Sequence, residues 1–298
     1  GCALFQPEQR EQRPLNVPSA WQQQQPSPVA VANAAAMPSE QWWAAFQDPQ
    51  LDTLIDNALR TNNDLAVAGI RVQRAQLQAG LANTNLTPGV VGQLNTSRGY
   101  DLKRGGVAGS ASSSLVTLSY ELDLWGRVRN LSDAARAGYL ASIEGARAFR
   151  LSLISSVAAA YFQLRAGEEQ IALAERTVAS RQEGGEIARI RMDAGVTSSV
   201  DYDQSMTLLT QARTELAQVQ RTTAQTANLL TVLIGGPPGT PPPAPRAIDD
   251  QGLIMEIDAG LPSSLLVNRP DILQAEQQLR AANANIGAAR AAFFPSIS

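Results

Sequence analysis

The sequence predicts a mainly α-helical protein that carries one β-hairpin, and three observations lead to this fold class. The stretch from Gly126 to Gly236 contains no proline. Through most of it, alanines and other apolar residues recur at steps of three and four, which is the period of one helix face. Ahead of it, two short segments alternate apolar and polar residues, as strands do. The patterns together indicate a long helical hairpin preceded by a pair of strands.

The composition excludes most catalytic chemistry. The chain of 298 residues has no histidine and one cysteine, so it offers no imidazole base, no His-ligated metal and no disulfide framework. Its 24 basic and 27 acidic side chains give a formal net charge of −3, whereas nucleic-acid binders concentrate positive charge. We therefore expect neither an enzyme nor a nucleic-acid partner, and neither a cofactor nor a metal site.

The N-terminal residues are typical of a tethered protein. No run of apolar residues approaches the roughly 20 that a membrane-spanning helix needs. Cys2 follows a small residue at the start, as in a processed lipoprotein, so we expect a lipid on Cys2; a plain thiol is the alternative. The residues up to 36 are rich in Gln, Pro and Ala, which is typical of a flexible tether.

Two helices are predicted next. Apolar residues at helical spacing begin after Trp42-Trp43, and Asn62-Asn63-Asp64 ends this first helix and caps the next. The second helix runs from about Leu65 to Asn83 and ends before Pro88-Gly89. One stripe of this helix is lined by Ala68, Val72, Ala75, Ala79 and Ala82.

The strand pattern occupies two segments. Apolar and polar residues alternate from Val90 to Ser97, and again from Leu115 to Leu124, with a loop expected over Gly99 to Gly109. In the second segment one face carries Val116, Leu118, Tyr120 and Leu122. Strands of about ten residues with one apolar face have the length of membrane-spanning β-strands, and they also suit a half-buried hairpin in a water-soluble protein.

The long helix is predicted from about Gly126 to Met192, which is roughly 100 Å at 1.5 Å per residue. Two neighbouring apolar stripes run along it, so we expect neighbouring helices on both of its sides. Asp193-Ala194-Gly195 ends the helix, and Ser198 or Ser199 with Asp201 caps the return helix, which ends at Gly235-Gly236. The whole has the dimensions of a rod.

An internal repeat is visible when the sequence is shifted by 207 residues. This shift places Asp64 on Asp271, Ala68 on Ala275, Ala75 on Ala282, Gly80 on Gly287, Ala82 on Ala289 and Pro88 on Pro295. A matching cap, glycine and terminal proline in one register indicate that a second unit of the same kind begins near the end of the chain.

Four motifs make the sequence resemble the TolC-like outer membrane factors, in their lipoprotein (NodT-like) branch that serves RND-type efflux pumps. They are Trp42-Trp43-x-x-Phe46-x-Asp48-Pro49-x-Leu51, Tyr120-Glu121-Leu122-Asp123-Leu124-Trp125-Gly126-Arg127, Gly195-Val196-x-Ser198-x-x-Asp201, and Arg269-Pro270-Asp271-Ile272 with Phe294-Pro295-Ser296. The resemblance implies a homotrimer with a transmembrane β-barrel, an α-helical tunnel across the periplasm and an equatorial girdle. It implies the channel of a tripartite efflux pump, a passive conduit for drugs and other small molecules.

The resemblance also implies an organisation and a set of site residues. This chain corresponds to an N-terminal fragment that holds the first structural repeat. The expected segments are a lipid-anchored tether at 1–36, equatorial helices at 37–63, a first tunnel helix at 64–87, a barrel hairpin at 88–124, the long tunnel hairpin at 125–236, a Pro-rich equatorial linker at 237–262 and the start of repeat two at 263–298.

The implied location is the outer membrane, with an extension into the periplasm. Lipid would face Val116, Leu118, Tyr120 and Leu122, and Trp125 would lie at the membrane interface, unless it packs the corner of a soluble hairpin. A periplasmic adaptor, the partner together with an RND-type transporter, would dock at Arg191, Gly195, Val196, Ser198 and Asp201. Capping and turning alone would also explain the residue types of that tip.

Two other functions compete with the channel. A periplasmic adaptor also combines a lipid anchor with a helical hairpin, but it flanks the hairpin with compact β-rich domains. Another lipid-anchored or cytoplasmic coiled-coil interaction protein would leave the strands of bilayer length unexplained.

Overall fold

The computed structural model describes residues 41–101, 105–237 and 268–298. Cys2, the 1–36 tether and almost all of the 237–262 linker lie outside the described residues. The chain divides into two compact units. Unit 1 holds the described parts of 68–148 and 262–298, and unit 2 those of 20–67 and 149–261. Each unit is described by itself.

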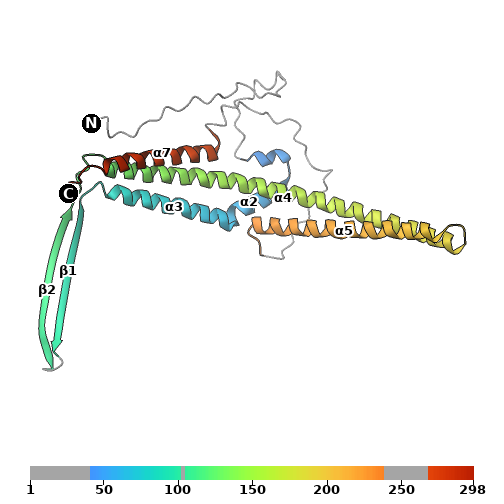
Figure 1. Cartoon of the computed structure of the whole chain (residues 1–298), viewed down its shortest axis with the longest axis horizontal. Helices are drawn as coiled ribbons and strands as arrows, with labels where there is room; N and C mark the ends of the chain where they lie inside the picture. The colour runs from blue at the N-terminus through green and yellow to red at the C-terminus, as the bar shows by residue number, and fades with distance from the viewer. Residues whose placement is uncertain (1–40, 102–104, 238–267) are drawn as a thin grey trace, which may run out of the picture. The chain divides into compact units, whose positions relative to one another are not determined.

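The elements follow the predicted order (Figure 1). In sequence they are the 3-10 helix η2 (Trp42–Phe46), α2 (Pro49–Thr61), α3 (Asn63–Thr84), β1 (Gly89–Asp101), β2 (Gly106–Ser119), α4 (Arg127–Asp193), α5 (Ser199–Leu233) and α7 (Pro270–Ala291). Within the described residues, no helix combines the length and the apolar character needed to cross a lipid bilayer.

Unit 2 has one hydrophobic core, where η2 and α2 pack on the middle of α4. Its buried members are Trp43, Leu51, Leu54, Ile55, Ala58, Leu153, Ile154, Val157, Ala158, Ala160, Tyr161, Leu164 and Leu230. Asn62 links α2, α3 and α5, because its Nδ2 donates to the carbonyl of Leu233 and its Oδ1 accepts from the amide of Leu65. Asn62 is therefore the capping residue of the predicted Asn62-Asn63-Asp64 triplet.

A buried ion pair joins the start of α2 to α4. Asp48 caps α2 by accepting from the amides of Gln50 and Leu51. Its second oxygen accepts from the Tyr161 hydroxyl at 2.8 Å and from Arg165 Nη1 at 3.3 Å. Asp48 is 2% exposed and Arg165 1%. Burial, the hydrogen bond to Asp48 and the charge of that carboxylate raise the pKa of Tyr161 to about 12, so the hydroxyl remains a donor throughout the physiological range.

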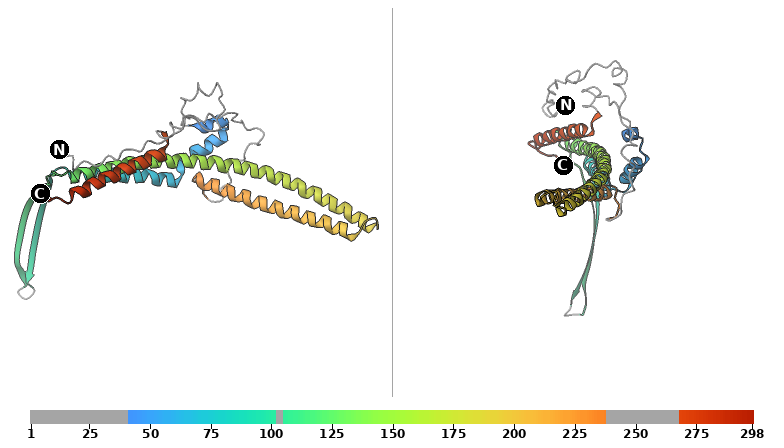
Figure 2. Two further views of the ribbon diagram at one scale, coloured as in Figure 1. Left: turned by 45° about the horizontal axis from the view of Figure 1, so that its top comes forward. Right: turned by 90° about the vertical axis from the view of Figure 1, so that its right-hand side faces the viewer.

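In unit 2, α5 lies antiparallel beside the last part of α4 (Figures 1 and 2). The two helices approach each other closely at Gly167, where an added Cβ would overlap the side chain of the buried Thr223. Only the absence of a side chain at Gly167 allows α5 to come this near.

In unit 1, the first part of α4 lies between α3 and α7 (Figure 1). The bounds of α7 are those of α3 shifted by 207 residues, as the internal repeat predicts for this helix. On α3, the predicted stripe of Ala68, Val72, Ala75, Ala79 and Ala82 is the partly buried side of the helix.

The β-hairpin is longer than predicted, and both predicted boundaries of its second strand are wrong. β1 and β2 extend through most of the predicted Gly99 to Gly109 loop, with a register shift between Gly99 and Tyr100. β2 ends at Ser119 rather than at Leu124, so Tyr120 and Leu122 lie beyond the strand. The alternation of Tyr120 to Leu124 continues that of the strand, but among the described residues no strand pairs with this segment.

The buried ion pair gives the first prediction. We expect Arg165→Met to lower the free energy of unfolding by about 3–5 kcal/mol, because it leaves the Asp48 carboxylate buried without its cation. Denaturant titration followed by circular dichroism measures this change. The exposed Arg176 on the same helix provides the control, since Arg176→Met should change stability by less than about 0.5 kcal/mol. Equal unfolding curves for the two variants would contradict the assigned role of Arg165.

Candidate functional site

Near its base, the hairpin has one face that carries several exposed apolar side chains. Residues that pair across antiparallel strands share a face, so Val90 and Leu118 lie together, as do Gly92 and Val116. The opposite face pairs Val91 with Thr117 and Asn95 with Ser113. The predicted grouping of Val116 with Leu118 is therefore confirmed, and Val90 and Leu94 extend their face onto β1. These four apolar side chains are each at least 67% exposed.

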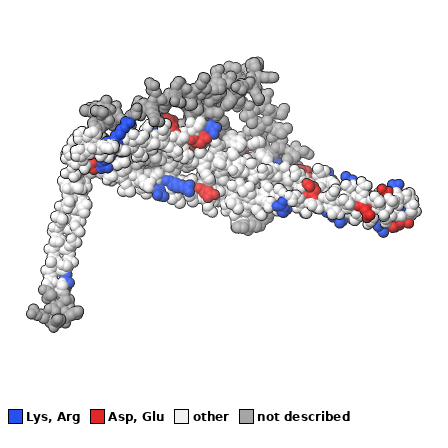
Figure 3. All heavy atoms as spheres, viewed as in Figure 1, with Lys and Arg blue, Asp and Glu red and all other residues white. Residues whose placement is uncertain are grey.

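The hairpin carries almost no charge. No Asp, Glu, Lys or Arg occurs from Gly89 to Ser97 or from Gly105 to Ser119. In Figure 3 the described part of the hairpin is white except for one basic group near its tip; Arg98 is the one Lys or Arg of the described strands. Exposed strands of a soluble protein are usually protected by charge against edge pairing, so this surface is adapted to an uncharged environment or to further strands.

The Asp123 carboxylate fixes the connection between β2 and α4, which is formed by residues 120–126. Asp123 Oδ1 accepts from the amide of Val128, and its Oδ2 accepts from the amide and from Nε of Arg129. The first amides of a helix have no partner within it, so Asp123 supplies two of them at the start of α4. Burial by itself raises the pKa of Asp123, but the two amides and the Arg129 guanidinium outweigh it and hold this pKa below its ordinary value.

A second ion pair, between Glu121 and Arg127, fixes the same connection. The Arg127 guanidinium donates to both oxygens of Glu121, from Nε at 3.1 Å and from Nη2 at 2.5 Å. Between the two acidic residues, the Leu122 amide donates to the carbonyl of Ile297. The acidic side chains at the end of the predicted strand are thus engaged in fixing the start of α4.

Trp125 links this connection to the segment that follows α7. Its ring stacks on Phe294 with the centroids 5.0 Å apart, and its Nε1 donates to the carbonyl of Pro295 at 2.9 Å. These contacts show Trp125 packing a corner within unit 1; its role at a membrane interface stays a prediction.

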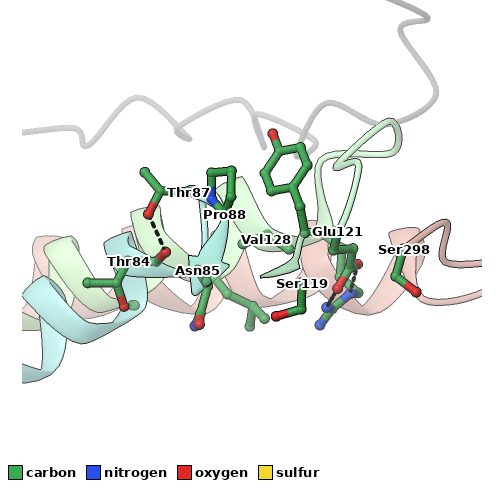
Figure 4. A pocket seen from close by; sticks show the side chains of 13 residues that line it. Thr84, Asn85, Thr87, Pro88, Ser119, Glu121, Val128 and Ser298 are labelled. Atoms are coloured by element: carbon green, nitrogen blue, oxygen red, sulfur yellow. Dashed lines mark hydrogen bonds and ion pairs between the residues drawn. The ribbon is translucent and has the colours of Figure 1, made fainter. Parts of the chain in front are cut away.

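A hollow of about 610 Å³ lies at the base of the hairpin (Figure 4). It is lined by Ala82, Thr84, Asn85, Thr87, Pro88, Gly89, Ser119, Tyr120, Glu121, Arg127, Val128, Leu131 and Ser298. Its charged members, Glu121 and Arg127, are paired with each other, and its other polar groups are hydroxyls and amides. In the part of the chain that the structure describes, no three Asp, Glu, Cys or His side chains could hold a metal ion together.

The five predicted docking residues lie at the tip between α4 and α5, with Arg191 in the last turn of α4 and Asp201 in the first turn of α5. Gly195 has a φ of 69°, the left-handed conformation expected of it. The amide of Val196 donates to the carbonyl of Arg191, which closes the turn. Ser198 is the N-terminal cap position of α5, although its side chain makes no capping hydrogen bond. Gly195, Val196, Ser198, Asp201 and Arg191 are all exposed.

The sequence prediction missed two features of these sites. The pairing of Glu121 and Asp123 with arginines six residues later was missed because both acids lie in the segment that alternation predicted as a strand up to Leu124. The second missed feature is the low charge of the hairpin. The sequence shows it directly, because no Asp, Glu, Lys or Arg occurs from Gly89 to Ser97 or from Gly105 to Ser119.

Comparison with known proteins supports one family. The sequence model of the outer membrane efflux protein family matches residues 54–236 and 261–298. The chain is 39% identical to the probable efflux pump outer membrane protein TtgC of Pseudomonas putida, with all of this chain and 62% of the relative covered. It is 36% identical to the cation efflux system protein CusC of Escherichia coli K12, with 100% and 64% covered.

A solved structure agrees with these relatives. The open state of the MtrE outer membrane channel of Neisseria gonorrhoeae superposes with a TM-score of 0.74 at 38% identity, over 97% of this chain and 64% of that one. The chain thus spans a little under two thirds of the length of each relative.

The capping role of Asp123 gives the second prediction. We expect Asp123→Ala to lower the free energy of unfolding by about 1–2 kcal/mol, because the amides of Val128 and Arg129 lose their acceptor. Thermal or denaturant unfolding measures the loss. Asp133→Ala, at an exposed position inside α4, is the matched control and should stay close to wild type.

The lowered pKa of Asp123 gives a third prediction, on acid stability. A carboxyl whose pKa is lower in the folded state than the ordinary value of about 3.9 stabilises the fold above that value. This stabilisation is lost as the pH falls through the folded-state pKa. We therefore expect the difference in unfolding free energy between wild type and Asp123→Asn to be full at pH 6 and to shrink steadily below pH 4. A difference that does not change with pH would contradict the ionised state of Asp123.

Proposed function

Because the chain belongs to the outer membrane efflux protein family, we propose that it forms part of the outer membrane channel of a tripartite efflux pump. In this role it is a passive conduit through which drugs and other small molecules leave the cell. The family is one of outer membrane efflux channels and not of enzymes, and its members belong to the outer membrane and the periplasm.

The observation that carries the proposal is the hairpin of β1 and β2. Its strands have 13 and 14 residues, more than the 9–11 that a tilted strand needs to cross a bilayer. One of its faces is apolar and exposed at Val90, Leu94, Val116 and Leu118, and charge is absent over most of its length. Such strands are stable in lipid when further strands complete a closed barrel.

The helices supply the second part of the conduit. α4 alone has 67 residues, a length of roughly 100 Å. Its small buried residues in unit 1, Ala134, Ala137 and Ala141, allow neighbouring helices to lie close together. A wall one helix thick around a water-filled bore needs such close lateral packing, since a gap between helices would leak.

The remaining roles complete this proposal. Three copies assemble as a homotrimer, a lipid on Cys2 anchors each copy to the outer membrane, and Trp125 lies near the level where the hairpin leaves the lipid. Lipid contacts the Val116 and Leu118 face, with Tyr120 and Leu122 beyond the strand. A periplasmic adaptor docks at the tip formed by Arg191, Gly195, Val196, Ser198 and Asp201, and links the channel to an RND-type transporter.

A pair of arginine substitutions tests the proposed channel. The substitutions are made in the full-length protein. Val116→Arg places a charge on the face assigned to lipid, and such a charge costs about 2–4 kcal/mol at the midplane of a membrane. We expect this variant to lose most of its outer membrane assembly. Thr117→Arg, one residue away on the other face, should assemble normally and shift the ion selectivity of single channels in planar bilayers.

Three measurements decide the outcome: the amount of protein in the outer membrane fraction, the conductance of the purified protein, and drug resistance restored to an efflux-deficient host together with its pump partners. A wild-type protein that fractionates with the inner membrane and shows no conductance would overturn the channel in favour of an adaptor. Normal assembly of Val116→Arg with failure of Thr117→Arg would reverse the assigned faces.

A further inference from the structure

Two adjoining hollows lie beside the connection between β2 and α4, and both belong to unit 1. The first has a volume of about 420 Å³ and lies between the end of α3 and the first turns of α4. The second has a volume of about 400 Å³ and follows the connection itself. Leu86 and Arg129 line both hollows, which therefore meet at these two side chains. We call the first the polar hollow and the second the apolar hollow.

The polar hollow contains one cation and one anion that have no partner within the described residues. It is lined by Ala79, Gly80, Asn83, Leu86, Arg129, Ser132, Asp133 and Arg136. The Arg129 guanidinium is already bound to Asp123. Asp133 and Arg136 are exposed, and neither side chain forms an ion pair in the described part of the chain, although the two are only three residues apart. Both charges are therefore available to a ligand.

The apolar hollow is lined by apolar side chains that the described chain leaves uncovered. Tyr120 is 41% exposed, Leu122 48% and Leu124 57%, and Leu86 completes the apolar lining. The two acidic residues of this lining are already held in ion pairs with arginines. The surface that this hollow offers to a ligand is hence mainly apolar, and exposed apolar side chains gathered in one place are typical of a binding site.

The unpaired charges favour a ligand that carries both signs. An anionic group alone would bind Arg136 and would leave the neighbouring Asp133 carboxylate close to a second negative charge. A phosphate joined to an ammonium group supplies a partner to each side chain. Helical side chains tilt toward the N-terminus of their helix, and the N-terminal residues of α4 are those next to the apolar hollow. Asp133 and Arg136 therefore tilt toward the apolar hollow.

From these observations we propose that the two hollows together bind one phospholipid whose headgroup carries a phosphate and an ammonium group. The phosphate binds the Arg136 guanidinium, the ammonium group binds the Asp133 carboxylate, and an acyl chain lies along Leu122 and Leu124. The proposal rests on the proposed channel, in which the hairpin crosses the membrane and the connection next to it lies at the level of the headgroups. Such a lipid covers the exposed leucines where the hairpin leaves the bilayer.

Binding of defined lipids to the purified full-length protein tests this site. The protein in mild detergent is titrated with phosphatidylethanolamine or with phosphatidylglycerol, and native mass spectrometry counts the bound lipid. We expect wild type to bind phosphatidylethanolamine more tightly, and Arg136→Gln to weaken this binding at least about tenfold, because a charge-assisted hydrogen bond is lost. Arg150→Gln is the matched control and should bind as wild type does, since Arg150 is an exposed arginine of α4 that lines neither hollow.

A second variant, Asp133→Asn, separates the two headgroup charges. It should lose the preference for phosphatidylethanolamine over phosphatidylglycerol, because the ammonium group loses its carboxylate while the phosphate keeps Arg136. Equal binding by Arg136→Gln and wild type would overturn the lipid site. A wild-type preference for phosphatidylglycerol would also overturn it, and so would a wild-type protein that binds neither lipid, since another part of the assembled protein would then cover the hollows.

The conductance of the same preparation in planar bilayers keeps the lipid site apart from the channel. A wild-type protein that conducts without binding lipid refutes only the lipid site. A wild-type protein that does not conduct refutes the channel on which the lipid site rests.

Discussion

The structure of unit 1 depends on how the backbone passes from a strand ladder into a helix without leaving its polar groups unpaired. Beyond Ser119 the ladder is finished, and the first amides of α4 have no partner within the helix. Asp123 accepts two of those amides, and the Leu122 amide finds the carbonyl of Ile297. These few bonds hold the start of α4 against the end of the hairpin and, through Ile297, against the segment that follows α7.

The sequence predicted those elements whose cause is local. α4 and α5 follow from their apolar period and the absence of proline, and the turn at Gly195 follows from the need for a left-handed residue. The repeat was predictable because it preserves a cap, a glycine and a proline at one spacing. The end of β2 was not predictable, because Tyr120 to Leu124 keep the alternation of a strand while Asp123 is drawn to α4. Alternation describes the side chains and does not report where the ladder stops.

Contacts between residues distant in the sequence were the harder part. Asp48 was predicted only as part of a motif, but in the structure it is both the cap of α2 and the partner of Arg165, 117 residues later. Arg165 stands within an ordinary amphipathic helix, and its charge gives no sign that it is buried. The packing of Asn130 on Gly287 is likewise invisible in either segment alone, although the repeat marks the glycine. The exposed docking tip was predictable as a turn, whereas its partner depends on another molecule.

The close approach at Gly167 limits the ways in which the hairpin of α4 and α5 can change shape. Thr223 occupies the notch that this glycine leaves, so α5 cannot travel lengthwise along α4 without driving its side chain into the neighbouring backbone. Shear is thereby blocked, whereas bending and splaying beyond the notch remain open. An opening of the tip between α4 and α5 would therefore pivot about the contact between Gly167 and Thr223.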